Sequence, residues 1–297
     1  MSKLKAVPPK AAEPSRPKIL IYGKPGVGKT WASLDFPSAY YIDTEGGADL
    51  AHYTDKLAAA KGAYFGIDQG SLDFDSVIEQ IKALATEEHP YKTVIIDSIT
   101  KIFNNEISKE AERLGDKNAF GADKKPALLL MKRLVSWLQR LDMNVILIAH
   151  EKSAWGMDSK GQRAEIGTTF DCYDKLEYEL HLCLNIVKIG GKHLAKVKKS
   201  RLKEFADAST LPWSYSDFAD CYGRDILERN TGAITLPTEA QLKELTTLIE
   251  AANIPQAAID KWLTAGNATE FKDLDADKVD KYILAIKDKL TKTIKGE

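Results

Sequence analysis

Long apolar runs, paired cysteines and an excess of one charge are all missing from this 297-residue chain. The apolar runs are far shorter than a membrane span and the N-terminus lacks the apolar core of a signal peptide, so we expect no membrane association and a cytoplasmic location. The three cysteines lack C-x-x-C spacing, which argues against a zinc or redox site. The net charge is -1, so any contact with nucleic acid must be confined to a local patch.

The remaining composition is that of a globular protein, with 44% hydrophobic and 29% charged residues. The length suits one large α/β domain of about 200 residues with a small appendage. Residues 1–17 contain Pro8, Pro9, Pro14 and Pro17 among Lys, Ala and Glu. This composition predicts a flexible tail.

From Lys18 onward, short apolar runs alternate with segments of helical periodicity. We expect buried parallel strands in four runs, at 18–22, 39–43, 93–97 and 144–149. Apolar residues recur at helical spacing over 75–85 and 126–141. The pattern predicts an α/β fold with a mainly parallel, doubly wound, twisted sheet that is flanked by helices.

In the second half of the chain the hydrophobic pattern differs from the alternation of apolar runs and helical segments before it. Residues 176–187 alternate as in a strand, and Gly190-Gly191 turns the chain into a hairpin partner at 194–199. Thr238 followed by Gln241 is a capping-box pattern that begins a helix. We therefore expect a core domain over 18–230, a linker over 231–237, and a small domain of three short helices over 238–297.

A complete phosphate-binding motif, G-x-x-x-x-G-K-[ST], follows the first apolar run. It comprises Gly23, Lys24, Pro25, Gly26, Val27, Gly28, Lys29 and Thr30. Strand, loop and helix start are the context that the motif requires, because the loop amides and the helix N-terminus face the phosphates. Lys29 would reach the outer phosphates and the Thr30 hydroxyl would ligate Mg²⁺. The motif predicts that the chain binds ATP or another nucleoside triphosphate together with Mg²⁺.

The apolar run 93–97 ends in Asp97, a carboxylate that we expect to hold the Mg²⁺ ion through a bound water. The alternative is that Asp97 caps the following helix, a role that Ser98 could also fill.

Asp43-Thr44-Glu45 ends another buried strand, and here the chain resembles the RecA family. That family carries its catalytic glutamate in a D-x-E pattern after the strand that follows the phosphate-loop helix, so the resemblance implies that Glu45 is the general base. The alternative is that Glu45 caps a turn before Gly46-Gly47. His150 ends the run 144–149, where RecA-like ATPases place a γ-phosphate sensor; it could also be a hydrogen-bonded structural residue.

Two further segments fit the resemblance. Residues 151–170 are rich in Gly, Ser and Thr and occupy the place of the family's second DNA-binding loop, so we expect a functional or disordered loop. Lys199-Ser200-Arg201 resembles the K-x-[KR] element that RecA-like and DnaB-like ATPases insert into a neighbour's active site. Residues 180–203 contain no acidic residue, although such a basic stretch can also be a solvated strand edge.

The resemblance covers roughly residues 18–205. It is strongest to compact RecA-core ATPases of bacteriophages, with an AAA-type nucleotide-binding domain, that are associated with single-strand annealing and recombination. This implies a DNA-stimulated ATPase that binds single-stranded DNA, assembles as a homo-oligomer, and works in the bacterial host cell if it is phage-encoded. The C-terminal helices could dock a recombination partner.

Alternatives to this function remain open. The chain could be a ring helicase-type motor, or an ATP-gated interaction protein with little turnover. Trp155, Phe170 and Tyr173 lie in or beside the suspected loop and could stack on bases or pack in the core. His52 or Tyr53 could contact the adenine.

Overall fold

The computed structural model describes residues 14–47, 50–119, 121–157, 159 and 161–295. Within this part of the chain, an eight-stranded sheet has the order β10-β9-β8-β1-β5-β4-β2-β3. Its strands are β1 (Lys18–Tyr22), β2 (Ala39–Asp43), β3 (Ala63–Phe65), β4 (Thr93–Asp97), β5 (Asn144–Ala149), β8 (Leu182–Ile189), β9 (Lys192–Ser200) and β10 (Thr210–Pro212). The four strands expected from the apolar runs are confirmed.

The sheet is mainly parallel. Strand β1 pairs in parallel with β5 on one side and β8 on the other, and β4 lies between β5 and β2. Strands β9 and β10 add an antiparallel edge next to β8. The central strands are buried along their whole length, which explains why they are continuous apolar runs.

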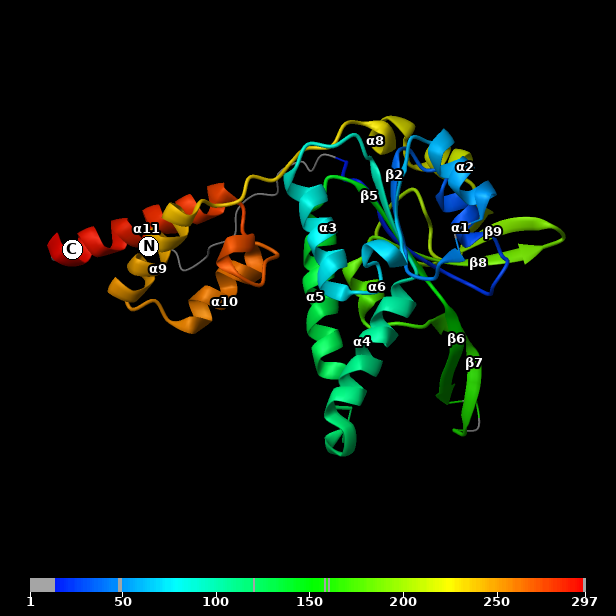
Figure 1. Ribbon diagram of the computed structural model, residues 1–297, viewed down its shortest axis with the longest axis horizontal. Helices are drawn as coiled ribbons and strands as arrows, with labels where there is room; N and C mark the ends of the chain where they lie inside the picture. The colour runs from blue at the N-terminus through cyan, green and yellow to red at the C-terminus, as the bar shows by residue number, and fades with distance from the viewer. Residues whose placement is uncertain (1–13, 48–49, 120, 158, 160, 296–297) are drawn as a thin grey trace.

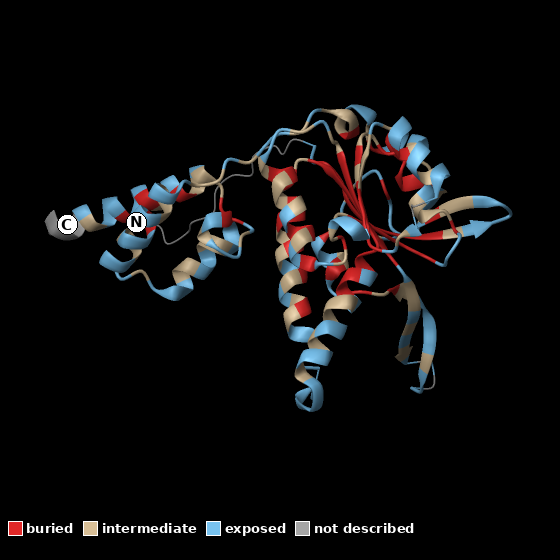
Figure 2. Cartoon of the chain, in the orientation of Figure 1, coloured by how far each residue is buried: buried red, intermediate tan, exposed pale blue. Residues whose placement is uncertain are grey.

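Helices cover both faces of the sheet (Figures 1 and 2). One face packs against α3 (Phe74–Thr86), α4 (Ile99–Leu114) and α5 (Lys124–Arg140). The other packs against shorter helices, namely α1 (Lys29–Ser33), α2 (Ala51–Ala59), α7 (Tyr215–Tyr222) and α8 (Arg224–Glu228). The expected fold class is confirmed: a mainly parallel sheet flanked by helices, with additional helices at the C-terminus.

The expectation of a continuous strand-like segment over 176–187 is wrong at its beginning. Residues Leu176–Glu179 form a helical turn, α6, and the strand starts only at Leu182. Leu176 and Leu180 are both fully buried whereas Tyr178 is 62% exposed, so the apolar residues do not share one strand face. The hairpin with a turn at Gly190-Gly191 is confirmed, because β8 and β9 pair antiparallel from Ile189 and Lys192.

Residues after β5 form an arm rather than an irregular loop. Strands β6 (Glu151–Met157) and β7 (Arg163–Phe170) make a separate two-stranded antiparallel sheet. Figure 1 shows this arm and the β8–β9 hairpin projecting away from the body of the sheet. Of the two expectations, a functional or a disordered loop, the disordered one is wrong, because strand pairing satisfies backbone groups that few apolar side chains cover. A functional role of this segment stays a prediction.

Three helices follow the long connection after α8: α9 (Glu239–Ala251), α10 (Gln256–Ala265) and α11 (Ala276–Lys295). The capping box between Thr238 and Gln241 is confirmed. These helices enclose an apolar cluster of their own around Leu245, Val279 and Ile283. The division into domains stays a prediction.

The expected tail, residues 1–17, lies mostly outside the described residues. Of its last part, Arg16 is only 2% exposed. Its guanidinium donates to Leu227 O at 2.8 Å and lies 3.5 Å from Asp142. This end of the segment is thus packed against the core.

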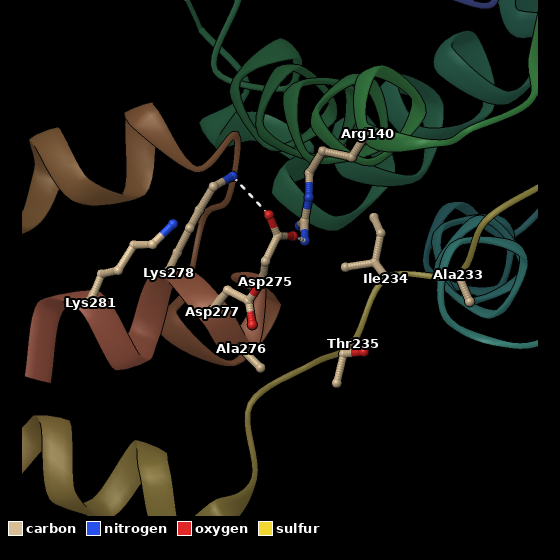
Figure 3. Close-up of a pocket in the computed structure, with 9 residues that line it drawn as sticks. All are labelled: Arg140, Ala233, Ile234, Thr235, Asp275, Ala276, Asp277, Lys278 and Lys281. Atoms are coloured by element: carbon tan, nitrogen blue, oxygen red, sulfur yellow. Dashed lines mark hydrogen bonds and ion pairs between the residues drawn. The ribbon is translucent and has the colours of Figure 1, made fainter.

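Ion pairs join the C-terminal helices to the core. Lys82 of α3 contacts Asp273 at 3.1 Å, and Arg140 of α5 contacts Asp275 at 2.7 Å while its guanidinium stacks 4.4 Å from the Trp137 ring centre. A cavity of about 470 Å³ lies at this junction. Figure 3 shows Arg140 reaching Asp275, which also pairs with Lys278. Asp275 of this cavity is therefore held by two cations, Arg140 and Lys278.

Among the described residues, no helix combines the length and the apolar character needed to cross a bilayer.

Candidate nucleotide site

The phosphate-binding motif forms the loop between β1 and α1. Gly23 passes so close to β8 that an added Cβ would lie 2.2 Å from Ile186 O. Gly28 has a φ of 87°, and a Cβ there would lie 2.8 Å from His193 Nδ1. Both positions therefore require glycine. Lys24, Pro25 and Gly26 are exposed at the tip of the loop, and Val27 anchors it in the core.

Lys29 folds back over this loop. Its ammonium donates to Gly23 O at 2.7 Å and to Lys24 O at 3.0 Å. Burial lowers the pKa of Lys29 below its ordinary value, although the Asp97 and Glu45 charges oppose this shift. The loop carbonyls thus hold the cation where phosphate oxygens could replace them.

Thr30 and Asp97 meet beside the loop. The Thr30 hydroxyl donates to Asp97 Oδ2 at 2.5 Å, and the Tyr41 hydroxyl donates to the same oxygen at 3.1 Å. Burial raises the pKa of Asp97 to about 6. Ser98 caps α4 by accepting a hydrogen bond from Lys101 N at 3.2 Å. The capping role therefore belongs to Ser98, and the Asp97 carboxylate is left for the site.

This pair fits a magnesium ion. Mg²⁺ is usually held by one or two protein oxygens together with substrate phosphates rather than by an all-protein cage. In the described part of the chain, no group of three or more His, Cys, Asp or Glu side chains could form such a cage. A hydroxyl and a buried carboxylate at one point beside a phosphate loop are the donors that this mode of binding needs.

Glu45 and His150 come together at the ends of β2 and β5. His150 Nε2 is hydrogen-bonded to Glu45 Oε1, and the Ser98 hydroxyl donates to the same oxygen at 2.5 Å. Burial would raise the pKa of Glu45, but the hydrogen bonds from Ser98 and His150 and the nearby Lys29 charge outweigh it, so this pKa lies below its ordinary value. The carboxylate is therefore ionised at neutral pH and able to accept a proton.

The alternative that Glu45 merely caps a turn does not match the contacts. Asp43 caps this turn, because its Oδ1 accepts hydrogen bonds from Glu45 N at 2.9 Å and Gly46 N at 3.0 Å. The Glu45 side chain points instead toward Ser98 and His150.

Lys199 and Arg201 lie away from this cluster within the protomer. Lys199 pairs with Cys183, which pairs with Leu20 near the middle of β1, whereas the phosphate loop follows the far end of that strand. The Lys199 ammonium donates to Leu180 O, and the Arg201 guanidinium donates to Tyr178 O. The structure does not bring these two cations to their own chain's phosphate loop.

A cavity lies beside the loop, and the sequence did not predict three of the aromatic and imidazole side chains that line it, those of Trp31, His193 and Trp213. This cavity of about 310 Å³ is lined by loop residues and by the rings of Trp31, Tyr53, His193 and Trp213. Trp31 directly follows the motif, which could have indicated it. His193 Nδ1 contacts Val27 O at 2.7 Å, but it arrives from the β8–β9 hairpin, so no sequence spacing could reveal it. Tyr53, one of the two expected adenine contacts, lines the cavity, and the His52 ring packs against Trp31.

Solved structures share limited similarity with the chain. The RadB recombinase has a TM-score of 0.41 and 17% identity, covering 65% of this chain and 84% of that one. An ATPase from the type III secretion system of pathogenic bacteria has a TM-score of 0.41 and 12% identity, covering 91% and 79%. The ATPase EscN of enteropathogenic E. coli, solved with its central stalk EscO, has a TM-score of 0.36 and 10% identity, covering 93% and 67%. The fold assignment rests on the sheet and loop described above.

No curated protein matches the sequence significantly. A family model described as an AAA domain matches residues 15–203, more than half of the chain. This range contains the phosphate loop, Asp97, Glu45 and His150, all of which converge in space. The chain belongs to the AAA domain family.

Proposed function

We propose that this protein is a Mg²⁺-dependent ATPase that acts on single-stranded DNA in phage-type recombination or annealing, assembled as a homo-oligomer. The observation that carries the proposal is the convergence of Thr30, Asp97, Glu45 and His150 at one edge of the sheet, at the base of the two-stranded arm formed by β6 and β7. This edge, at the carboxyl ends of parallel strands, is where open α/β sheets bind ligands.

The chemistry is hydrolysis of the terminal phosphoanhydride. Glu45 accepts a proton from water as the water oxygen bonds to the γ-phosphorus, the bond from that phosphorus to the β–γ bridging oxygen breaks, and ADP leaves. Lys29 neutralises charge on the outer phosphate oxygens. Bound Mg²⁺ would supply further charge neutralisation between Thr30 and Asp97.

The arm suits single-stranded nucleic acid. Trp155 is 57% exposed, and the Arg163 guanidinium lies 5.7 Å from its ring centre. Exposed rings flanked by cations are the groups on which single-strand binders stack bases. Phe170, by contrast, is buried against Tyr22, so its role is packing.

The arm is joined to the nucleotide site at its base. His150 N donates to Thr100 Oγ1 at 2.9 Å, and Asp171 N donates to His150 O at 2.8 Å. His150 also contacts Glu45. A phosphate that attracts the His150 ring would therefore shift His150, which precedes β6, and Asp171, which follows β7. This contact path supports coupling between nucleotide state and DNA affinity.

The positions of Lys199 and Arg201 support the oligomeric part of the proposal. Lys199 and Arg201 lie too far from their own loop to neutralise charge on the phosphates, so a neighbouring subunit would have to supply them. In head-to-tail contacts the same two surfaces repeat from subunit to subunit, which leaves ring and filament both possible. The C-terminal helices, which carry their own apolar core, would be free to dock a recombination partner.

The deciding experiment is the steady-state ATP hydrolysis rate over a protein-concentration series, with and without an oligo(dT) strand. We expect the rate per protomer to rise with both DNA and concentration. A measurable rate per protomer that changes with neither DNA nor protein concentration would contradict the DNA-binding and oligomer parts of the proposal. Absence of turnover with intact ATP binding would favour an ATP-gated interaction protein.

A further inference from the structure

Two buried hydroxyls tie together the ends of the strands that carry Glu45 and Asp97. Thr44 and Ser98 are both fully buried. Thr44 N donates to Asp97 O at 2.7 Å, Ser98 N donates to Thr44 Oγ1 at 2.8 Å, and Thr44 Oγ1 donates to Ser98 O at 3.0 Å. These three bonds, here named the Thr44 staple, extend the pairing of β2 with β4 by one residue beyond Asp43 and Asp97.

The staple holds the main chain of Ser98, and helix α4 orients its hydroxyl. A serine hydroxyl has one proton to donate. Because the Ser98 oxygen accepts from Lys101 N at the start of α4, its proton is directed elsewhere, and it points at Glu45 Oε1, 2.5 Å away. The Glu45 carboxylate is therefore placed by a group that is itself fixed to β2 through Thr44.

The main chain at Glu45 is fixed from the opposite side as well. Asp43 is 1% exposed and accepts from the two amides that follow Thr44. Glu45 is thus held by Asp43 through its backbone and by Ser98 through its carboxylate. Thr44 connects these two sets of contacts, because it lies between Asp43 and Glu45 in the chain and is hydrogen-bonded directly to Ser98.

We propose that Thr44 is a positioning residue that sets the place of the Glu45 carboxylate relative to Asp97 and Thr30. This inference rests on the proposed ATPase function and assigns it a buried residue whose hydrogen bonds go to Asp97 and Ser98. The hydroxyl is essential because it acts as donor and acceptor at once, which valine, with the same shape, cannot do. Loss of the staple frees Ser98, and Glu45 moves with it.

The test compares Thr44→Val with Thr44→Ser. Small displacements of a catalytic group cost about 10²-fold in rate, so we expect Thr44→Val to lower kcat roughly 10- to 100-fold. The KM for ATP and the affinity for a non-hydrolysable ATP analogue should stay unchanged, because Thr44 makes no hydrogen bond to the phosphate loop. Thr44→Ser keeps the hydroxyl and should restore most of the wild-type kcat.

Three results would overturn the inference: an unchanged kcat in Thr44→Val, an equal loss in Thr44→Ser, or a loss that appears in KM alone. If Thr44→Val does not fold, as judged by its melting curve, Thr44→Ala provides the same test with a smaller side chain.

A second readout separates this inference from the ATPase proposal. If the wild type does not hydrolyse ATP, the pKa of the Glu45 carboxyl can be followed by carbon-13 NMR. Bonds from Ser98 and His150 hold this pKa below its ordinary value, so we expect it to rise in Thr44→Val. An unchanged pKa would mean that Thr44 does not position Glu45.

Discussion

At the scale of single residues, Glu45 is the group on which hydrolysis depends. Its carboxylate is ionised and accepts two hydrogen bonds, whereas the glutamine in Glu45→Gln has a similar shape but cannot take a proton. We expect this variant to lower kcat by about 10²- to 10⁴-fold and to keep its affinity for ATP, measured by equilibrium binding. Glu151→Gln is the matched control, because Glu151 is a nearby carboxylate that contacts Asn185 instead. Equal losses in both variants would show a general effect of charge.

Lys18 is a residue whose influence is on stability. It is 4% exposed, and its ammonium donates to Leu141 O and Met143 O, each at 2.7 Å. Burial lowers the pKa of Lys18 to about 7, far below the value of about 10.4 in an unfolded chain. Between these values the unfolded chain binds more protons than the folded one. The free energy of unfolding should therefore rise with pH in this window, by at most about 1.4 kcal/mol per unit from this group.

Lys18→Met should remove that rise. Urea unfolding between about pH 7 and 9 would show a flatter dependence in the variant than in the wild type. Lys101→Met, at an exposed lysine of α4, should leave the slope unchanged. Parallel curves for wild type and Lys18→Met would contradict the prediction.

At the scale of elements, buried strands were predictable and partly exposed ones were not. The strands β1, β2, β4 and β5 are enclosed on both faces, so their sequences are continuous apolar runs with sharp ends. The β6–β7 arm packs against little, and its polar residues carry no periodic signal. Residues 176–180 were wrongly predicted to be a strand. Leu176 and Leu180, four positions apart, are both buried because a helical turn precedes the strand.

The site follows the same logic. Thr30 is predicted from the phosphate-loop motif, and Asp97, Glu45 and His150 are predicted because each ends or follows a strand of one parallel sheet. His193 and Trp213 come from the antiparallel edge and reach the loop only through the folding of β8, β9 and β10. The Thr44 staple likewise depends on the strand order, which places β2 next to β4 although α2, β3 and α3 separate them in the chain.

The β6–β7 arm carries its own prediction. Stacking of one base on an aromatic ring contributes about 1–3 kcal/mol, so Trp155→Ala should weaken binding of oligo(dT) roughly 5- to 150-fold. Fluorescence anisotropy with a labelled strand measures this directly. Met157→Ala is the control, since Met157 is 74% exposed on the same strand but has no ring. A similar loss in both variants would indicate that the arm binds through apolar area rather than base stacking.

At the scale of the whole molecule, the C-terminal helices and the core meet through charge. The cluster around Leu245 is separate from both apolar layers of the sheet. The ion pairs Lys82 with Asp273 and Arg140 with Asp275 join the two parts. Ion pairs of this kind weaken as salt screens them, whereas the apolar packing of the sheet does not.

Whole-molecule assembly is tested best by mixing two inactive variants. Lys29→Ala has a defective phosphate loop but keeps Lys199 and Arg201, while Arg201→Ala has an intact loop but lacks the cation. If Arg201 acts in a neighbour's site, Arg201→Ala alone should lose about 10³-fold or more in kcat. An equal mixture should then recover activity, because about a quarter of head-to-tail contacts join an intact loop to an intact Arg201.

Arg201 that acted within its own chain would give no recovery, since neither variant then holds a complete site. The geometry makes recovery the expected outcome. Arg201 donates to Tyr178 O, and it follows the end of β9 that pairs through Leu182 with Ile19 near the start of β1, whereas the loop follows the opposite end of β1. For the cation to reach a phosphate, it must leave that carbonyl and cross to another subunit. Recovery should therefore grow with total protein concentration, and a recovered rate that does not would mean that mixed oligomers are already fully assembled at the lowest concentration.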